Sequence, residues 1–166
     1  MMKMLSYLKP DAVFENMRVV PYSELKEKGY QYALLDLDNT LAEDHVTEPT
    51  PYTFEIIRSL QDNGFTCCIV SNAKSTRSAE FAAKIPIDCL SYANKPSPSG
   101  IIKALSLLNA PKNKAVFFGD QILTDVIAAR RAGIYTILVE PITKREVFYV
   151  RLKRPLEKII RFFMQY

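Results

Sequence analysis

Short apolar runs alternate along the chain with segments in which apolar residues recur at helical spacing. The apolar runs predict strands at 31–37, 65–71, 88–92, 114–119 and 134–139. The segments of helical spacing predict helices at 52–63, 75–84, 99–108 and 122–132. Strands that alternate with helices build βαβ units, and strands that are apolar on both faces need cover on both sides. We therefore predict an α/β fold in which helices cover both faces of a parallel sheet.

The predicted helix at 52–63 shows how this pattern assigns a buried side. Phe54, Ile57 and Leu60 recur at helical spacing, and Gly64 follows where the helix is expected to end. We expect these three apolar side chains to face the sheet.

Polar residues stand at or just beyond the carboxyl ends of four of the predicted strands. They are Asp36 and Asp38, Ser71 and Asn72, Asn94 and Lys95, and Asp120 with Asp125 shortly after it. In an open parallel sheet, ligands bind just beyond the carboxyl ends of the strands. We therefore expect these side chains to meet at one end of the sheet and to form the functional site.

The chemistry that suits these groups is phosphoryl transfer. Carboxylates next to an apolar run are costly to bury unless they are paired or bind a metal, and an all-oxygen ligand set suits Mg²⁺ better than zinc. A carboxylate such as Asp36 can attack phosphorus, and a second one such as Asp38 can move the proton. Lys95 and the metal would offset the charge of the phosphoryl group, while Ser71 would hold its oxygens.

These residues resemble all four motifs of the haloacid-dehalogenase-like hydrolase superfamily, in the same order. The matching stretches are Asp36-Leu37-Asp38-Asn39-Thr40, Ser71, Lys95-Pro96 and Gly119-Asp120-Gln121-Ile122-Leu123-Thr124-Asp125. The resemblance covers about residues 30–140 and implies a three-layer Rossmann-like fold of the type found in that superfamily. It also implies a phosphatase, because phosphatases of the superfamily carry Asp at the position of Asp38 and its dehalogenases lack it.

The resemblance assigns roles to the motif residues. It implies that Asp36 is the nucleophile and that Asp38 is the general acid and base. It also implies that Ser71 and Lys95 bind the phosphoryl group, with Asn72 as a further backbone donor. Lys95 is counted among the catalytic residues as well.

The same resemblance implies a magnesium site. Its ligands would be Asp36, the main-chain carbonyl group of Asp38, and Asp120. Asp125 would lie at the outer side of this site or orient Lys95. From the pattern alone, Asp125 can also be a carboxylate in the first turn of a helix, where the helix dipole favours negative charge.

The spacing of the motifs leaves no room for a cap domain, the insertion from which this superfamily builds substrate specificity. Only 32 residues separate Asp38 from Ser71, and 23 separate Ser71 from Lys95. The chain thus resembles the capless IIIA subfamily, whose open site suits a macromolecule, a lipid in a membrane or a small substrate enclosed by a partner subunit. The first, third and fourth motifs, with the basic C-terminal segment, further resemble bacterial proteins similar to phosphatidylglycerophosphate phosphatases, which implies a lipid phosphate as substrate.

The basic charge of the chain is concentrated near its end. The whole chain has a formal net charge of +4, whereas residues 144–166 alone hold seven basic and two acidic residues. We divide the chain into an N-terminal extension at 1–28, a phosphatase core at 29–143 and a basic amphipathic segment at 144–166. This last segment can pack its apolar side on the core or lie on an anionic membrane surface. Its aromatic residues lack the spacing of a base-stacking surface, so we do not expect nucleic acid as a partner.

The composition is that of a folded globular protein, with 48% hydrophobic and 24% charged residues. No apolar run has the length of a membrane span, and residues 1–9 lack the apolar core of a signal peptide. The three cysteines lack the spacing of metal ligands. We therefore expect a cytoplasmic protein, either free or peripheral to a membrane.

Two other functions stay open at this stage. The same fold can serve a regulatory protein that binds a ribosomal or membrane partner, and a phosphotransferase shares the aspartyl-phosphate and differs only in its acceptor. His45, the only histidine, lies in the loop after the first motif, where it can contact substrate or simply be exposed. The pattern does not decide the oligomeric state.

Overall fold

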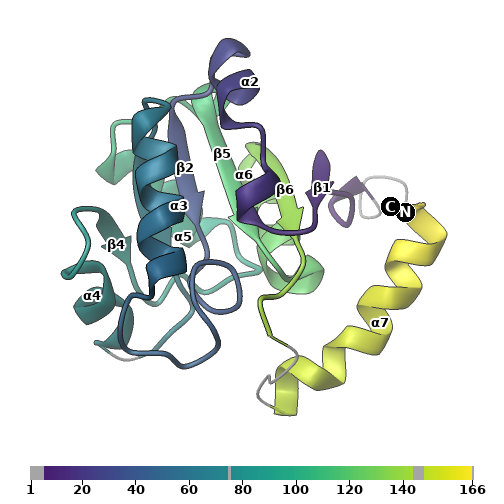
Figure 1. Ribbon diagram of the computed structural model, residues 1–166. Coiled ribbons are helices and arrows are strands. Elements are labelled where there is room, and N and C mark those ends of the chain that lie inside the picture. The colour runs from purple at the N-terminus through teal and green to yellow at the C-terminus, as the bar shows by residue number, and fades with distance from the viewer. Residues whose placement is uncertain (1–5, 75, 144–147, 166) are drawn as a thin grey trace.

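A six-stranded parallel sheet forms the centre of the protein, with the strand order β1-β6-β5-β2-β3-β4 (Figure 1). The structure is a computed structural model and describes residues 6–74, 76–143 and 148–165. The strands are β1 (Ala12–Phe14), β2 (Tyr32–Leu35), β3 (Thr66–Val70), β4 (Asp88–Leu90), β5 (Ala115–Gly119) and β6 (Tyr135–Val139). The predicted parallel sheet is confirmed, and β1 is an additional strand.

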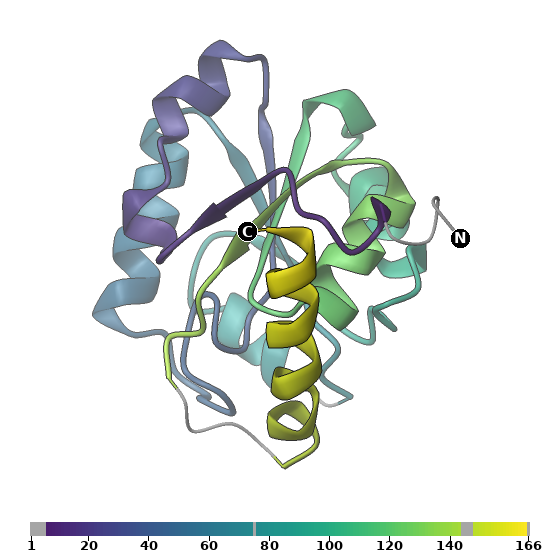
Figure 2. The same cartoon turned by 90° about the vertical axis from the view of Figure 1, so that its right-hand side faces the viewer.

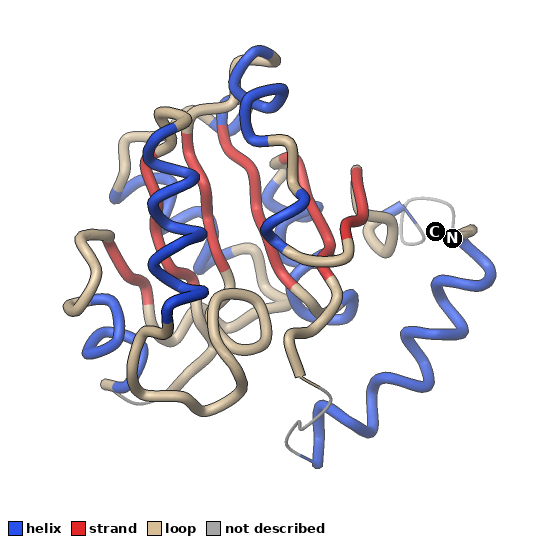
Figure 3. Tube along the Cα trace, viewed as in Figure 1, coloured by secondary structure: helices blue, strands red, loops and turns tan. Residues whose placement is uncertain are grey.

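Helices cover both faces of this sheet. The α-helices are α2 (Tyr22–Glu27), α3 (Pro51–Asp62), α4 (Arg77–Ala82), α5 (Ser99–Leu107), α6 (Ile127–Ala132) and α7 (Phe148–Met164). Shorter helices of other types are η1 (Met17–Val19), η2 (Lys112–Lys114) and the π-helix η3 (Ile122–Val126). One face carries α2, α3 and α4, and the other carries α5 and α6 (Figure 3). The three-layer α/β fold is therefore confirmed.

The two apolar layers follow from the alternation of side chains along each strand. Ala33 and Leu35 of β2 belong to the cluster under α3, while Leu34 between them belongs to the cluster under α5. Phe118 and Phe117 of β5 divide in the same way. Successive side chains of a strand point to opposite faces, so a continuous apolar run fills both layers at once.

The buried side of α3 differs from the prediction at one residue. It is formed by Thr53, Ile56, Ile57 and Leu60. Phe54 was expected there but is 47% exposed, because it lies about 100° around the helix from Thr53. Burial of Thr53 is possible since its hydroxyl donates a hydrogen bond of 2.9 Å to the carbonyl oxygen of Leu41. A polar residue thus takes the place that the apolar pattern gave to a phenylalanine.

The helix predicted at 122–132 consists of two parts. Its first turn is the π-helix η3, and α6 continues from it. Gly133 ends α6 in the left-handed conformation with φ of 79°, which glycine adopts without steric cost. Single π-turns are found mostly inside helices and often near functional sites.

Residues before position 28 add to the central core. β1 pairs with β6, and the carboxylate of Asp11 accepts a 2.8 Å hydrogen bond from the main-chain N–H of Thr136. Met17 and Leu25 are buried in the cluster on the α3 face. The division into segments 1–28, 29–143 and 144–166 stays a prediction.

The described part of the chain holds no cap domain. A loop, α3 and β3 occupy the interval between Asp38 and Ser71, and α4 and β4 occupy most of the interval between Ser71 and Lys95. These helices and strands belong to the three layers of the central fold, as predicted.

The C-terminal helix α7 lies beside β1 and β6, outside the helical layers (Figure 2). Val150 is buried, and Ile160 packs against a small cluster of Ile122, Val126 and Leu138. Five larger apolar side chains of α7 are between 51% and 79% exposed: Leu152, Leu156, Ile159, Phe162 and Phe163. We call these five the outward stripe. Part of the apolar side of α7 thus packs on the core, as one of the two interpretations expected, while the outward stripe is largely exposed.

None of the helices in the described ranges is long and apolar enough to cross a membrane.

Candidate active site

Polar side chains from the four motifs meet beyond the carboxyl ends of the central strands. Asp36 directly follows β2, and Asp120 directly follows the neighbouring strand β5. Ser71 directly follows β3, and Lys95 lies in the loop after β4. All four residues are buried. The topology thus gathers residues that are far apart in the sequence.

Lys95 lies between two carboxylates at the centre of this group. Its Nζ atom is 2.6 Å from Oδ1 of Asp36 and 2.8 Å from Oδ1 of Asp125. Asp125 can come this close because residue 119 is a glycine, at which a Cβ atom would lie 2.6 Å from the Cβ of Asp125. Lys95 therefore links the first motif to the fourth.

The side chain of Asn72 holds the loop that carries Lys95. Its Oδ1 atom accepts a 2.7 Å hydrogen bond from the main-chain N–H of Lys95, and its Nδ2 atom donates one of 2.9 Å to the carbonyl oxygen of the same residue. Next to it, the hydroxyl oxygen of Ser71 accepts a 3.1 Å hydrogen bond from the N–H of Ala73. The loops after β3 and β4 are thereby tied together.

Three buried carboxylates form a candidate metal site. Oxygen atoms of Asp36, Asp120 and Asp125 lie within 4.8 Å of one another. Oδ1 of Asp120 is buried and has no hydrogen-bond partner among the described residues. Such an atom is costly to bury, and a divalent cation would satisfy it. An all-oxygen donor set is the one that Mg²⁺ prefers, so these residues fit the predicted metal.

The crowding of these carboxylates raises their proton affinity. Burial, and then the negative charge of Asp125, raise the pKa of Asp36 to about 7, although the ammonium group of Lys95 lowers it. Burial, and then the charge of Asp125, raise the pKa of Asp120 well above its ordinary value, against the guanidinium of Arg154. The charges of Asp125 and Asp36 raise the pKa of Lys95 although burial lowers it, so the ammonium stays protonated. A bound cation would favour the ionised carboxylates.

The side chain of Asp38 lies outside this cluster and is held by Arg77, at the start of α4. One guanidinium nitrogen of Arg77 donates to both carboxylate oxygens of Asp38, at 2.8 and 2.6 Å. The other donates to the carbonyl oxygen of Val46 at 3.0 Å, and the N–H of His45 donates to Asp38 at 3.2 Å. This arrangement concerns the side chain of Asp38. The predicted metal contact of Asp38 is through its main-chain carbonyl group and stays a prediction.

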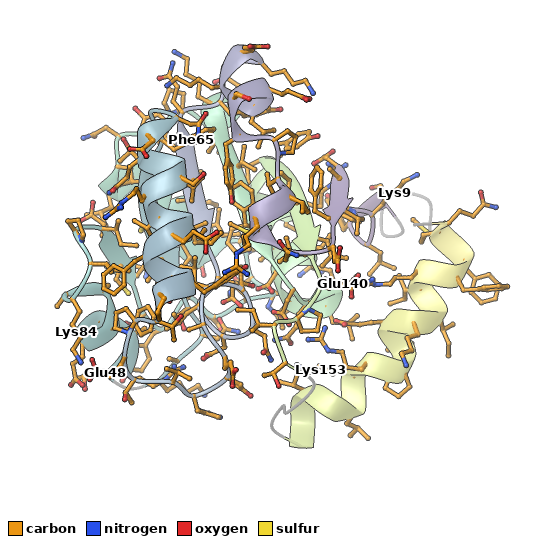
Figure 4. The ribbon with its side chains drawn as sticks, in the orientation of Figure 1. Lys9, Glu48, Phe65, Lys84, Glu140 and Lys153 are labelled. Atoms are coloured by element: carbon orange, nitrogen blue, oxygen red, sulfur yellow. The ribbon has the colours of Figure 1, made fainter. Side chains whose placement is uncertain are left out.

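These groups line one cavity of about 830 Å³. Its lining includes Asp36, Asp38, His45, Asn72, Lys95 and Asp125, together with Lys74, Arg77, Tyr92 and Lys153. Lys153 belongs to α7, and Figure 4 labels it. Besides Lys95, the lining thus includes three basic side chains, those of Lys74, Arg77 and Lys153, and these suit an anionic substrate.

A second side chain of α7 reaches the carboxylates. The guanidinium of Arg154 pairs with the carboxylate of Asp120, and it also donates a 2.9 Å hydrogen bond to the main-chain oxygen of Asp120. It donates a further bond of 2.8 Å to Glu157 on the same helix. The C-terminal segment therefore contributes directly to this site.

The sequence profile of the haloacid dehalogenase-like hydrolase family matches residues 9–133. The chain belongs to this family. The family that the four motifs indicated is thereby confirmed, over a stretch that also includes β1.

This hydrolase is similar over most of its length to curated proteins. It is 32% identical to "Probable phosphatase YqeG" of Bacillus subtilis over 154 residues, which are 93% of this chain and 90% of that protein. It is 26% identical to "Phosphatidylglycerophosphate phosphatase 1, chloroplastic" of Chlamydomonas reinhardtii, over 90% of this chain but 59% of that protein. The chain thus spans less than two thirds of the algal protein.

Solved structures share the fold of this hydrolase at low sequence identity. An uncharacterized protein from Listeria monocytogenes serotype 4b superposes with a TM-score of 0.56 and 19% identity, covering 71% of this chain and 84% of that one. A haloacid dehalogenase-like hydrolase from Streptococcus pneumoniae superposes with a TM-score of 0.51 and 12% identity, covering 66% and 84%. At these identities the likeness concerns the fold alone.

Sequence analysis missed two arginines of the site in this hydrolase. Arg77 follows Ser71 closely and lies in the first turn of α4. The signal for it in the sequence is a basic residue soon after a residue predicted to bind phosphate. Arg154 was counted only as part of a charge pattern. The ion pairs that these arginines form, with Asp38 and Asp120, join elements whose approach depends on the tertiary fold.

Proposed function

We propose that this hydrolase is a magnesium-dependent phosphatase that acts through an aspartyl-phosphate on Asp36. The observation that carries the proposal is the ammonium group of Lys95, held between Asp36 and Asp125. Close to it, Oδ1 of Asp120 has no hydrogen-bond partner in the part of the chain that the structure describes. The relative from Bacillus subtilis, whose printed name is that of a probable phosphatase, also supports it.

In the first step, a carboxylate oxygen of Asp36 attacks phosphorus and the bond to the leaving oxygen breaks. Asp38 gives its proton to that oxygen, so an alcohol leaves and the phosphoryl group stays on Asp36. In the second step, Asp38 takes a proton from water, the water oxygen attacks phosphorus, and the bond to Asp36 breaks. Inorganic phosphate leaves, and both carboxyl groups return to their starting states.

Other residues bind the group that is transferred. Lys95 and Ser71 hold phosphoryl oxygens, and Asn72 fixes the loop of Lys95 as described above. Magnesium held by Asp36, the carbonyl group of Asp38 and Asp120 would neutralise charge on the phosphoryl oxygens. Asp125 orients Lys95 from the opposite side.

Hydrolysis of p-nitrophenyl phosphate by the whole chain tests this proposal. Activity should require Mg²⁺, disappear with EDTA and fall by roughly 10³-fold or more in Asp36→Asn. Asp62→Asn, which changes an exposed carboxylate at the end of α3, is the matched control and should keep activity. Full activity of Asp36→Asn would refute the mechanism. Transfer to added glycerol in preference to water would instead identify a phosphotransferase, and inactivity on a broad phosphate panel would favour the regulatory function.

We also propose that the substrate is a lipid phosphate, such as phosphatidylglycerophosphate, at an anionic membrane surface. The uncapped cavity is open to a large substrate, and the outward stripe lies on α7, whose Val150 and Lys153 line that cavity. Lys158 is exposed on the same helix and can pair with anionic lipids. The chain would then be a cytoplasmic protein that binds a membrane peripherally.

Vesicles of phosphatidylglycerol and phosphatidylcholine test the lipid proposal. The wild-type chain should sediment with them and release phosphate from embedded phosphatidylglycerophosphate, whereas Leu156→Glu in the outward stripe should weaken sedimentation several-fold. Leu107→Glu, at a similarly exposed leucine on α5, is the matched control and should sediment like the wild type. Equal sedimentation of both variants would exclude the stripe as the membrane contact, and efficient turnover of soluble phosphates alone would exclude the lipid substrate.

A further inference from the structure

The polar face of α7 is attached to the candidate metal site through Arg154. Its guanidinium group pairs with the carboxylate of Asp120 and donates a 2.9 Å hydrogen bond to the main-chain oxygen of that residue. The side chain of Asp120 is fully buried, and that of Arg154 is 18% exposed. Arg154 is therefore a cation placed directly on a carboxylate that would bind Mg²⁺.

Glu157 fixes this arrangement from the other side. One of its carboxylate oxygens accepts a 2.8 Å hydrogen bond from Arg154, and the other accepts a 3.1 Å bond from the N–H of Leu123 in η3. Glu157 is buried, and η3 is also the segment that carries Asp125. The contact between α7 and the site is thus a connected set of charged groups.

The charges of the site show what Arg154 does there. Asp36, Asp120 and Asp125 are three buried carboxylates, and Lys95 is a single cation between two of them. Arg154 supplies a second positive charge on the third carboxylate. The Oδ1 atom of Asp120 has no hydrogen-bond partner among the described residues, whereas its Oδ2 atom pairs with Arg154. A divalent cation on Oδ1 would place further positive charge on the same carboxylate, and it would repel that guanidinium.

Other described residues of α7 also contact the core. Val150 is buried, Ile160 packs against the cluster of Ile122, Val126 and Leu138, and Arg161 pairs with Glu140. The five side chains of the outward stripe are 51% to 79% exposed, so most of their surface does not contribute to docking. Among the described contacts, the charged set around Arg154 is the one that joins α7 to Asp120.

We propose that Arg154 is a built-in counter-cation of the metal site, so that docking of α7 and binding of Mg²⁺ at Asp120 compete. α7 then acts as a latch: Mg²⁺ displaces Arg154 and loosens the helix, and anything that holds α7 away from the core raises the affinity for Mg²⁺. By thermodynamic linkage, the two effects are equal in size. This inference rests on the proposed metal site and concerns its regulation.

Calorimetric titration of the whole chain with Mg²⁺ tests the latch. Arg154→Gln should bind Mg²⁺ at least about ten-fold more tightly than the wild type, because a site that is closed in nine molecules of ten loses ten-fold in apparent affinity. Lys158→Gln is the matched control, since it removes an equal charge from the same helix at an exposed position. Its affinity should change much less.

Hydrogen exchange of the α7 amides gives a second measurement on the unaltered protein. Added Mg²⁺ should speed exchange in α7 of the wild type, whereas α7 of Arg154→Gln should exchange fast from the start. The wild-type measurement decides the matter even if Arg154→Gln does not fold.

Three results would overturn the proposal in distinguishable ways. Equal affinity of the wild type and Arg154→Gln, with no effect of Mg²⁺ on α7, would remove the latch and leave the metal site in place. Weaker binding by Arg154→Gln would show that Arg154 supports the cation. Absence of Mg²⁺ binding in every variant would remove the metal site and the latch together.

Discussion

Arg77 holds the carboxylate that the proposed mechanism uses as acid and base. Both oxygens of Asp38 accept from one guanidinium nitrogen of Arg77, and the second nitrogen is anchored on the carbonyl group of Val46. Arg77 thus determines where the Asp38 side chain points. It acts through Asp38, so it is a positioning residue.

Replacing Arg77 by glutamine should lower kcat for p-nitrophenyl phosphate by roughly 10- to 100-fold, because Asp38 would lose its orientation toward the leaving oxygen. Arg77→Lys should recover part of kcat. Arg58→Gln, at an exposed arginine on α3, serves as the control and should behave like the wild type. An Arg77→Gln protein with wild-type kcat would show that Asp38 is oriented by other groups.

Gly119 determines how closely Asp125 can approach Lys95. A methyl group there would meet the Cβ, Cγ and Oδ2 atoms of Asp125 at 2.6 to 2.7 Å. Gly119→Ala should therefore cost about 1–3 kcal/mol in the free energy of unfolding and also reduce activity. Urea unfolding and phosphatase assays measure the two effects.

Gly133→Ala separates these effects from general strain. Its Cβ atom would contact nothing within 4 Å, but φ of 79° is unfavourable for alanine. We expect it to lose stability and keep activity. If Gly119→Ala also kept full activity, the position of Asp125 would not matter for catalysis.

Sequence patterns predicted the residues that chain connectivity brings together, and missed those that depend on packing. Asp36, Ser71 and Asp120 each follow a strand of the same parallel sheet, so their convergence follows from the topology. Arg77 and Arg154 reach their partners through ion pairs between separate elements, which leave no periodic signal. Their roles could be read only from the folded chain.

At the scale of single elements, α3 gives a direct test of which side chains are buried. Ile57→Ala should lower the free energy of unfolding by about 2–4 kcal/mol, because it leaves a cavity under the helix. Phe54→Ala, at an exposed position, should cost about 1 kcal/mol or less. Urea unfolding of both variants checks the difference. Similar losses would mean that the buried side has been assigned wrongly.

Periodicity placed most of α3 correctly and failed where polar groups bond to the main chain. Phe54 fits an apolar row at sequence level, but Thr53 is buried in its place, with its hydroxyl group bonded to the main-chain oxygen of Leu41. In α7, the apolar row was recognised while its direction was not, because charged groups face the core there. A hydrophobic pattern identifies an amphipathic helix, but it does not indicate which face of that helix packs against the core.

For the molecule as a whole, the buried carboxylates make stability depend on pH. Burial raises the pKa of Asp36 to about 7 from an ordinary value of 3.8. Between these values the folded protein keeps a proton that the unfolded chain has released. The free energy of unfolding of the metal-free protein should therefore fall as pH rises through this window, by up to about 1.4 kcal/mol per pH unit for one such group.

Urea unfolding in EDTA from pH 4 to pH 8 measures this dependence. Asp36→Asn should show a flatter profile, since the titrating group is gone while Asp120 still titrates. Asp62→Asn should keep the wild-type profile. Parallel profiles of the wild type and Asp36→Asn would contradict the raised pKa of Asp36.

The two hydrogen bonds between Asn72 and the main chain of Lys95 have a consequence for inhibitors. They join the loops after β3 and β4, so the main chain around Ser71 and Lys95 is held together before any ligand binds. A small tetrahedral or planar oxyanion can therefore enter without an ordering transition, and its affinity would vary little with the flexibility of the rest of the chain. Selectivity for a compound would have to come from the rim of the cavity, because the preorganised floor accepts any group of the right charge and size.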